Sequence, residues 1–154
     1  MTHSLSLSVF IVLVSACSAS RQMTKESAIG VLYYQNYDLK ISRAGAMDTA
    51  YYVITNAKEF EDVFTRVREV DAKAPNFTGQ TLVAISAPAA TRLRVIRAAI
   101  ASSDMNVYAG TCDANEAGCP ENGLAVSTVP KSFSVKRVVF YINSRLVKQL
   151  PVSY

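Results

Sequence analysis

Three cysteines and a single histidine carry most of this chain's capacity for nucleophilic, redox or metal chemistry. Cys112 and Cys119 enclose six residues, so a disulfide between them would close a short loop. A zinc site would need at least two further Cys or His ligands, and the chain after residue 17 offers neither. We therefore predict a disulfide between Cys112 and Cys119, formed in an oxidising compartment, and neither a metal nor another cofactor.

Other catalytic groupings are scarce. Ser-His-Asp and Cys-His mechanisms need an imidazole base, and His3 lies in a segment that we expect to be removed. The sequence contains no Gly-rich phosphate-binding loop. Lys131 and Ser132 are adjacent, so on a strand their side chains would point to opposite faces. We predict a protein without catalytic activity, with a small envelope hydrolase as the alternative.

The segment between and just after the paired cysteines is rich in oxygen ligands. Asp113, Asn115, Glu116 and Glu121 are of the types that bind calcium. The three acidic ones, Asp113, Glu116 and Glu121, could also act as paired carboxylates. Their spacing differs from that of an EF-hand loop, and solvent around a surface loop keeps carboxylates ionised. We predict a solvated polar loop held by the disulfide.

Basic residues concentrate toward the end of the chain, where residues 122–154 include five basic and no acidic side chains. If the strands that carry them are neighbours, one sheet face or edge is positive and suits an anionic lipid headgroup, an acidic glycan or an acidic protein surface. A nucleic acid is not expected, because no exposed aromatics alternate with the cations. The alternative is a solvated face whose Lys and Arg guard a sheet edge. The candidate binding face consists of Arg92, Arg94, Lys136, Arg137, Arg145 and Lys148.

The first 16 residues read as an export signal. They contain no Lys, Arg, Asp or Glu, and their apolar stretch over 5–14 is too short to span a bilayer. Val14-Ser15-Ala16-Cys17 resembles the lipobox of bacterial lipoproteins, a family in which the chain is cut before the cysteine and the cysteine is acylated. The resemblance implies a lipidated Cys17, and Ser18 after it implies the outer membrane.

The predicted signal peptide and lipidated cysteine divide the chain into three parts. Residues 1–16 are the predicted signal peptide, and 17–28 are the lipidated cysteine and a flexible tether of small and polar residues. Residues 29–154 form one β-rich domain, a suitable size for a single core. An ordinary cleaved signal or a buried N-terminal strand, with Cys17 as a plain residue, is the alternative.

The domain is expected to contain one helix among many strands. Asn56 and Glu59 form a capping-box pattern, and apolar residues recur at helical spacing from Phe60 to Val67, so we predict a helix from Asn56 to about Val70. Asn143-Ser144 has the form of a two-residue hairpin turn. The resulting fold class is α+β, with a mainly antiparallel, roll-like or sandwich-like sheet and one amphipathic helix. Strands are predicted over 29–34, 39–41, 50–54, 81–85, 92–100, 106–110, 124–129, 135–142 and 145–150.

Five short segments of the domain form a recognisable series: Glu59-Phe60-Glu61-Asp62-Val63-Phe64, Asn76-Phe77, Leu82-Val83-Ala84-Ile85, Val129-Pro130-Lys131 and Val138-Val139-Phe140. With these segments, roughly residues 50–142 resemble the PrcB-like secreted accessory subunits of protease complexes. The resemblance implies a non-catalytic binding domain. The expected function is that of a membrane-anchored lipoprotein that binds another envelope or secreted protein, as an accessory subunit or modulator of a protease; a glycan-binding or anionic-surface-binding protein is the alternative.

Overall fold

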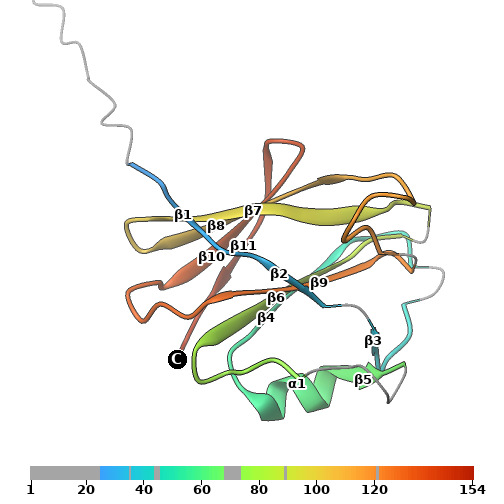
Figure 1. The fold of residues 1–154 in the computed structure, drawn as a ribbon, viewed down its shortest axis with the longest axis horizontal. Coiled ribbons are helices and arrows are strands. Elements are labelled where there is room, and N and C mark those ends of the chain that lie inside the picture. The colour runs from blue at the N-terminus through green and yellow to red at the C-terminus, as the bar shows by residue number, and fades with distance from the viewer. Residues whose placement is uncertain (1–24, 35, 44–45, 68–73, 89, 121) are drawn as a thin grey trace, which may run out of the picture.

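A computed structural model of the chain describes residues 25–34, 36–43, 46–67, 74–88, 90–120 and 122–154 (Figure 1). The predicted signal peptide and Cys17 lie outside these residues. Within them, no helix is long and apolar enough to cross a membrane.

Two stacked β-sheets form the body of the domain, and a helix with a two-stranded sheet lies below them in Figure 1. Every ladder is antiparallel except that between β8 and β10. The predicted fold class, an α+β sandwich-like fold with a single helix in the described part, is confirmed. The first sheet contains, in spatial order, β1 (Ser27–Ile29), β7 (Leu93–Ala101), β8 (Asp104–Thr111), β10 (Arg137–Ile142) and β11 (Arg145–Pro151). The second contains β2 (Leu32–Tyr34), β9 (Leu124–Pro130), β6 (Gln80–Ser86) and β4 (Ala50–Ile54), and the small sheet pairs β3 (Tyr37–Leu39) with β5 (Phe64–Arg66).

The main core lies between the two large sheets. Alternate side chains of each strand point into it, as the period of two along a strand requires. Val83 and Ile85 come from the second sheet, while Val95, Val107 and Phe140 come from the first, and none of the five is exposed to solvent.

The other face of the second sheet carries a smaller core. Leu82 and Ala84 of β6 pack there against aromatic side chains of the layer formed by α1 (Ala57–Val63), β3 and β5. The ring of Phe60 lies 5.0 Å from that of Tyr37 and 5.3 Å from that of Phe64. The second sheet is therefore covered on both faces.

The helix begins as predicted but ends earlier. Asn56 caps it by accepting a hydrogen bond from the Glu59 amide, and the Glu59 carboxylate accepts one from the Thr55 amide. At Phe64 the backbone becomes extended and pairs with Leu39 of β3. Phe60 and Phe64 both reach the smaller core, so their spacing fits a short helix followed by a strand as well as one long helix. Residues 68–70 lie outside the described residues.

The strand predicted over 29–34 is two strands in two different sheets. β1 pairs with β7, the chain crosses over at Gly30 and Val31, and β2 then pairs with β9. Ser27 and Ala28 already belong to β1, so the expected tether extends into the fold at its end. The strand predicted over 39–41 lies instead over Tyr37–Leu39.

The hairpin turn at Asn143-Ser144 is confirmed. Both residues have positive φ, 48° and 66°, which is the conformation of a type I′ turn. The turn joins β10 to β11 and so fixes the register of the last strand.

Candidate functional site

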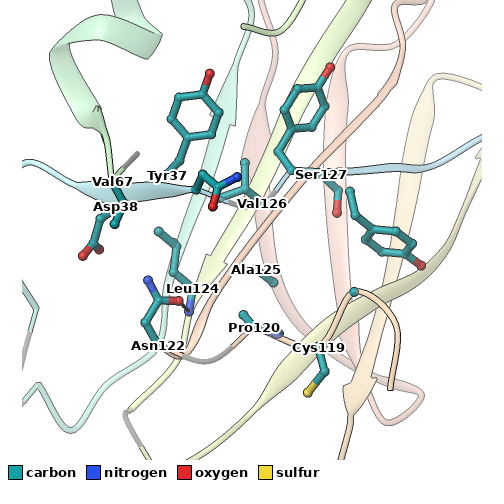
Figure 2. A pocket seen from close by; sticks show the side chains of 14 residues that line it. Tyr37, Asp38, Val67, Cys119, Pro120, Asn122, Leu124, Ala125, Val126 and Ser127 are labelled. Atoms are coloured by element: carbon teal, nitrogen blue, oxygen red, sulfur yellow. Dashed lines mark hydrogen bonds between the residues drawn. The ribbon is translucent and has the colours of Figure 1, made fainter. Parts of the chain in front are cut away.

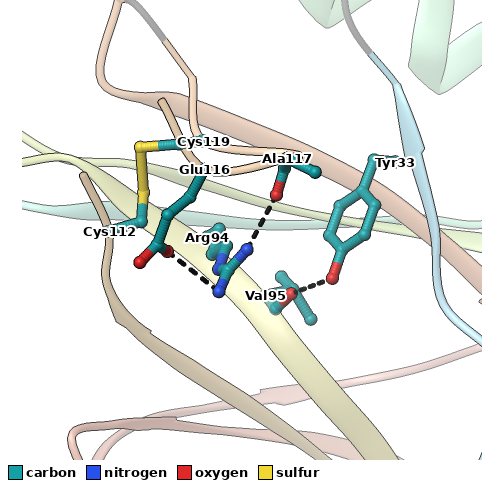
Figure 3. A network of polar contacts seen from close by, with 7 residues as sticks. All are labelled: Tyr33, Arg94, Val95, Cys112, Glu116, Ala117 and Cys119. Atoms are coloured by element: carbon teal, nitrogen blue, oxygen red, sulfur yellow. Dashed lines mark hydrogen bonds and ion pairs between the residues drawn. A yellow bond between two sulfur atoms is a disulfide. The ribbon is translucent and has the colours of Figure 1, made fainter. Parts of the chain in front are cut away.

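The predicted disulfide is present. Cys112 and Cys119 are bonded, with their Cα atoms 5.8 Å apart, and they close the loop after β8. Arg94 holds this loop, because its guanidinium lies 2.9 Å from Glu116 Oε2 and donates to the Ala117 carbonyl at 2.8 Å (Figure 3). One of the two acidic side chains of the loop, Glu116, thus forms an ion pair with an arginine of β7.

Calcium-binding geometry is not found in this loop. Glu116 is paired with Arg94, and Glu121 lies outside the described residues. Within the part of the chain that the structure describes, no three His, Cys, Asp or Glu side chains are grouped so as to hold a metal ion.

The six basic residues predicted as one binding face do not form a continuous face. Four of them, Arg94, Arg137, Arg145 and Lys148, lie on strands of one sheet, but β8 and β10 separate β7 from β11. On β8, Arg94 lies opposite Gly110 and Arg137 lies opposite Asp104. These two β8 positions are six residues apart, which is about 20 Å along the strand. Ion pairs also neutralise both of these arginines.

Arg92 lies just before β7, near Arg94, and Lys136 lies just before β10, near Arg137. These two residues are therefore also at opposite ends of the sheet. The Arg92 carbonyl accepts from the Cys112 amide, and the Lys136 amide donates to Ser103. The Arg137 guanidinium donates two hydrogen bonds, of 2.9 and 2.6 Å, to the Asp104 carboxylate.

The remaining two, Arg145 and Lys148, lie on β11, which forms one edge of the sheet. Both are exposed, and among the described residues neither makes an ion pair within 4.0 Å. Six of the seven β11 residues are exposed, including Leu146 at 53% and Val147 at 40%. β11 is the longest of the four edge strands of the two large sheets.

The opposite edge of the same sheet is held by a polar cluster that sequence reasoning missed. The Glu26 carboxylate accepts hydrogen bonds from Arg97 at 3.1 Å, from Asn106 at 2.7 Å and from the hydroxyl of Tyr108. The guanidinium of Arg97 lies 3.6 Å from the centre of the Tyr108 ring, which stacks on Tyr141. This Glu26 cluster attaches the residue before β1 to β7 and β8.

The hydrogen bonds of the Glu26 cluster set its charge state. The pKa of Glu26 is lowered, chiefly because Tyr108 donates to the carboxylate and further because Arg97 and Asn106 do. Burial, and then the neighbouring carboxylate, raise the pKa of Tyr108. Glu26 therefore stays ionised and Tyr108 protonated, which is the arrangement that the hydrogen bond requires.

The Lys131–Ser132 pair has no catalytic geometry. The Lys131 ammonium donates to the carbonyls of Thr55 and Phe77, at 3.4 and 3.1 Å, and the Ser132 hydroxyl lies 2.9 Å from that of Ser134. Lys131 and Ser132 thus form their hydrogen bonds with other residues and not with each other.

A pocket of about 440 Å³ opens between the end of β2 and the disulfide loop (Figure 2). Its walls come from the end of β2, from Asn36 and β3, from Asn122 and the start of β9, and from the end of the loop. No motif marked it in the sequence, because the segments that line it are distant along the chain. Its lining residues include Asn36, Asp38, Cys119, Asn122, Leu124 and Ser127.

Comparison of the chain with protein-family models, with curated proteins and with solved structures found no match.

Proposed function

We propose that this chain is a non-catalytic envelope lipoprotein whose β-rich domain binds another envelope or secreted protein, and that the partner adds a strand to the free edge of β11. The observation that carries the proposal is the exposure of β11, a seven-residue strand at the edge of the sheet. Its outer hydrogen-bonding edge pairs with no described strand. An exposed edge of this length is a template for another chain, with backbone hydrogen bonds that supply affinity.

The orientation of the β11 amides identifies which groups a partner would meet. The Val152 amide donates to Lys136, on the β10 side. Because amides alternate between the two edges of a strand, the amides of Leu150 and Lys148 point toward β10 and that of Gln149 points away from it. Pro151, which has no amide hydrogen, also lies at an outward position, so it removes no hydrogen bond between β11 and β10.

The charges of β11 favour a partner other than a second copy. The strand carries Arg145 and Lys148 and no acidic residue, so pairing with itself would bring like charges together. An acidic extended segment would pair with the same side chains favourably. The expected partner is therefore a protein with an acidic edge strand or tail, a class that includes a protease whose accessory subunit this chain would be.

The anchor would hold the domain near the membrane. The ten residues from Cys17 to Glu26, which precede β1, span at most about 35 Å when extended. A lipid on Cys17 would confine the domain to that distance from the bilayer and would raise the local concentration of β11 for envelope partners.

The experiment is affinity capture of the domain from envelope extracts, with Gln149→Pro and Gln149→Ala compared. Proline at Gln149 blocks the outward edge and leaves the inward amides, whereas alanine changes only the side chain. We expect the parent and Gln149→Ala to retain one stoichiometric protein and Gln149→Pro to lose it. Equal retention by all three, or retention of glycan without any protein, would contradict the proposal.

A separate experiment tests the anchor. Cys17→Ala should release the protein from the membrane fraction into the soluble fraction, because the acylated cysteine is the only proposed attachment. A variant that stays as tightly membrane-bound as the parent would show that lipid attachment at Cys17 is wrong, without bearing on β11.

A further inference from the structure

We propose that the pocket between the end of β2 and the disulfide loop binds a neutral saccharide of one or two sugar units. This inference is independent of the lipid anchor and of strand addition at β11. It rests on how the pocket is formed, on the polar groups in its wall and on the absence of any basic side chain among its lining residues.

The pocket exists because β2 is shorter than its partner. The ladder between β2 and β9 ends at the pair Tyr34–Val126, while β9 continues back to Leu124. At Asn36 the backbone takes a positive φ of 72° and turns away toward β3. The space beside the start of β9 is left without a strand and has a volume of about 440 Å³, which suits a small ligand.

The backbone of Leu124 faces this space. Backbone groups alternate between the two edges of a strand, so Leu124 presents its amide and carbonyl to the same edge as Val126 does. No described strand pairs with Leu124 on that edge. The Asn122 side chain accepts from the Leu124 amide at 3.2 Å, which leaves the Asn122 NH₂ group and the Leu124 carbonyl as a neighbouring donor and acceptor.

The side chains around the pocket add matching groups (Figure 2). Asn36 contributes an amide, and Asp38 a carboxylate that uses one oxygen to accept from the Leu39 amide at 2.8 Å. Ser127, also in the wall, is 1% exposed, and its hydroxyl has no hydrogen-bond partner among the described residues. Amide, carboxylate and carbonyl groups that offer donors and acceptors side by side match the adjacent hydroxyls of a sugar.

Charge decides between ligand classes. Asp38 is the one side chain charged at neutral pH among the described lining residues, so an anionic ligand would meet repulsion and no counter-charge. A simple cation would use the oxygens of Asp38, of the two asparagines and of Leu124, but it would leave the NH₂ donors of the asparagines without an acceptor. A neutral polyhydroxylated ligand uses all of these groups.

The wall on the loop side is held rigidly. Cys119 is fixed by the disulfide, and at Gly118 a side chain would place its Cβ only 3.1 Å from the ring of Tyr33. The Tyr33 hydroxyl donates to the Val95 carbonyl at 2.8 Å, which ties this contact to the first sheet (Figure 3). A wall fixed before binding reduces the entropy lost when a ligand binds.

The test is saturation-transfer NMR of the folded domain with maltose, cellobiose, lactose and N,N′-diacetylchitobiose, and with glucuronic acid and spermidine as charged probes. We expect at least one neutral disaccharide to bind with a Kd of about 1 mM or tighter, and both charged probes to bind more weakly. Asn36→Gly keeps the positive φ and removes the amide, and Asp38→Ala removes the carboxylate; each should weaken binding about tenfold or more.

Two matched variants serve as controls. Asn143→Gly removes another asparagine of positive φ, and Asp113→Ala removes a carboxylate of the disulfide loop outside the pocket. Both should bind the sugar like the parent, and thermal unfolding should show all four variants folded. Failure of every neutral disaccharide to bind, preference for spermidine, or unchanged binding in folded Asn36→Gly and Asp38→Ala would overturn the proposal. Gln149→Pro should leave sugar binding unchanged, so failure here and failure at β11 are distinguishable.

Discussion

The two edges of the five-stranded sheet are protected in different ways. At one edge, β1 has three residues, the Glu26 cluster ties the residue before it to β7 and β8, and the chain continues directly into the second sheet. At the other edge, β11 has seven residues, six of them exposed, and no strand or described loop pairs with its outer side. The short β1, the closed edge, is held by the chain that continues into the second sheet and by the hydrogen bonds of Glu26. Only the charges of Arg145 and Lys148 and the missing amide hydrogen of Pro151 disfavour pairing at β11, the open edge.

This difference favours β11 over β1 as the place for an added strand. β1 offers only three residues before the chain crosses to the second sheet, while β11 presents outward backbone groups along seven. Substitutions at the two edges, in the core behind β11 and in the disulfide loop should therefore have separable effects.

Phe140→Ala should have the largest effect, because β10 supports the open edge. Phe140 is fully buried between the sheets, with its ring 5.2 Å from that of Tyr51. Removing a buried phenylalanine side chain costs about 3–5 kcal/mol of unfolding free energy. Denaturant unfolding measures it, and Phe133→Ala, at a position that is 78% exposed, is the control and should cost less than about 1 kcal/mol. Equal losses in the two variants would mean that the core assignment of β10 is incorrect.

Replacing both Cys112 and Cys119 with serine should act on the side of β2 and leave β11 intact. The loop closed by the disulfide is short, so its loss should lower stability by about 2–3 kcal/mol. Unfolding with and without reductant measures the change, and reductant should no longer alter the variant. Partner capture through β11 should persist; its loss in the folded variant would show that the two regions are coupled.

Glu26→Gln should loosen the closed edge. Hydrogen bonds to a charged group contribute more than neutral ones, so we expect a loss of about 1–2 kcal/mol at pH 7. Because the pKa of Glu26 is lowered from 4.5, its contribution is complete above that pH and is lost as the pH falls through the lowered pKa. The difference from the parent should therefore shrink in acid, and a constant difference from pH 7 to pH 3 would rule out this role for the carboxylate.

Arg145→Glu with Lys148→Glu should change stability least, by less than about 0.5 kcal/mol, since both side chains are exposed and make no ion pair among the described residues. The same double substitution should abolish capture of an acidic partner, because it reverses the charge of the open edge. Arg94→Gln, on the disulfide-loop side, is the control that should keep the partner. A partner retained by the charge-reversed domain would argue against an acidic segment.

Local patterns predicted much of the sandwich. Short apolar runs bounded by turn residues or proline located β6, β7 and β9, and the Asn143-Ser144 pair predicted the final hairpin, because these signals depend only on near neighbours in the chain. The helix was predicted too long since Phe60 and Phe64 fit either periodicity, and pairing of Phe64 with Leu39 decided the outcome. Gly30, where the predicted first strand divides, was a signal that could have been used.

The sites could not be predicted in the same way. Glu26 and Asn106 are 80 residues apart and meet only because β1 and β8 both flank β7. The basic residues were expected to gather, but the sheet order places two strands between Arg94 and Arg145. The pocket likewise depends on where the ladder between β2 and β9 stops, which is a matter of non-local pairing that no single segment encodes.

Amide hydrogen exchange of the domain, alone and with its captured partner, tests strand addition at β11 most directly. In the free domain the outward amide of Gln149 should exchange fast and the inward amide of Leu150 slowly. Partner binding should slow exchange at Gln149 and leave the amides of β1 unchanged. Slowed exchange elsewhere in the domain, with Gln149 as fast in the complex as in the free domain, would contradict strand addition at β11.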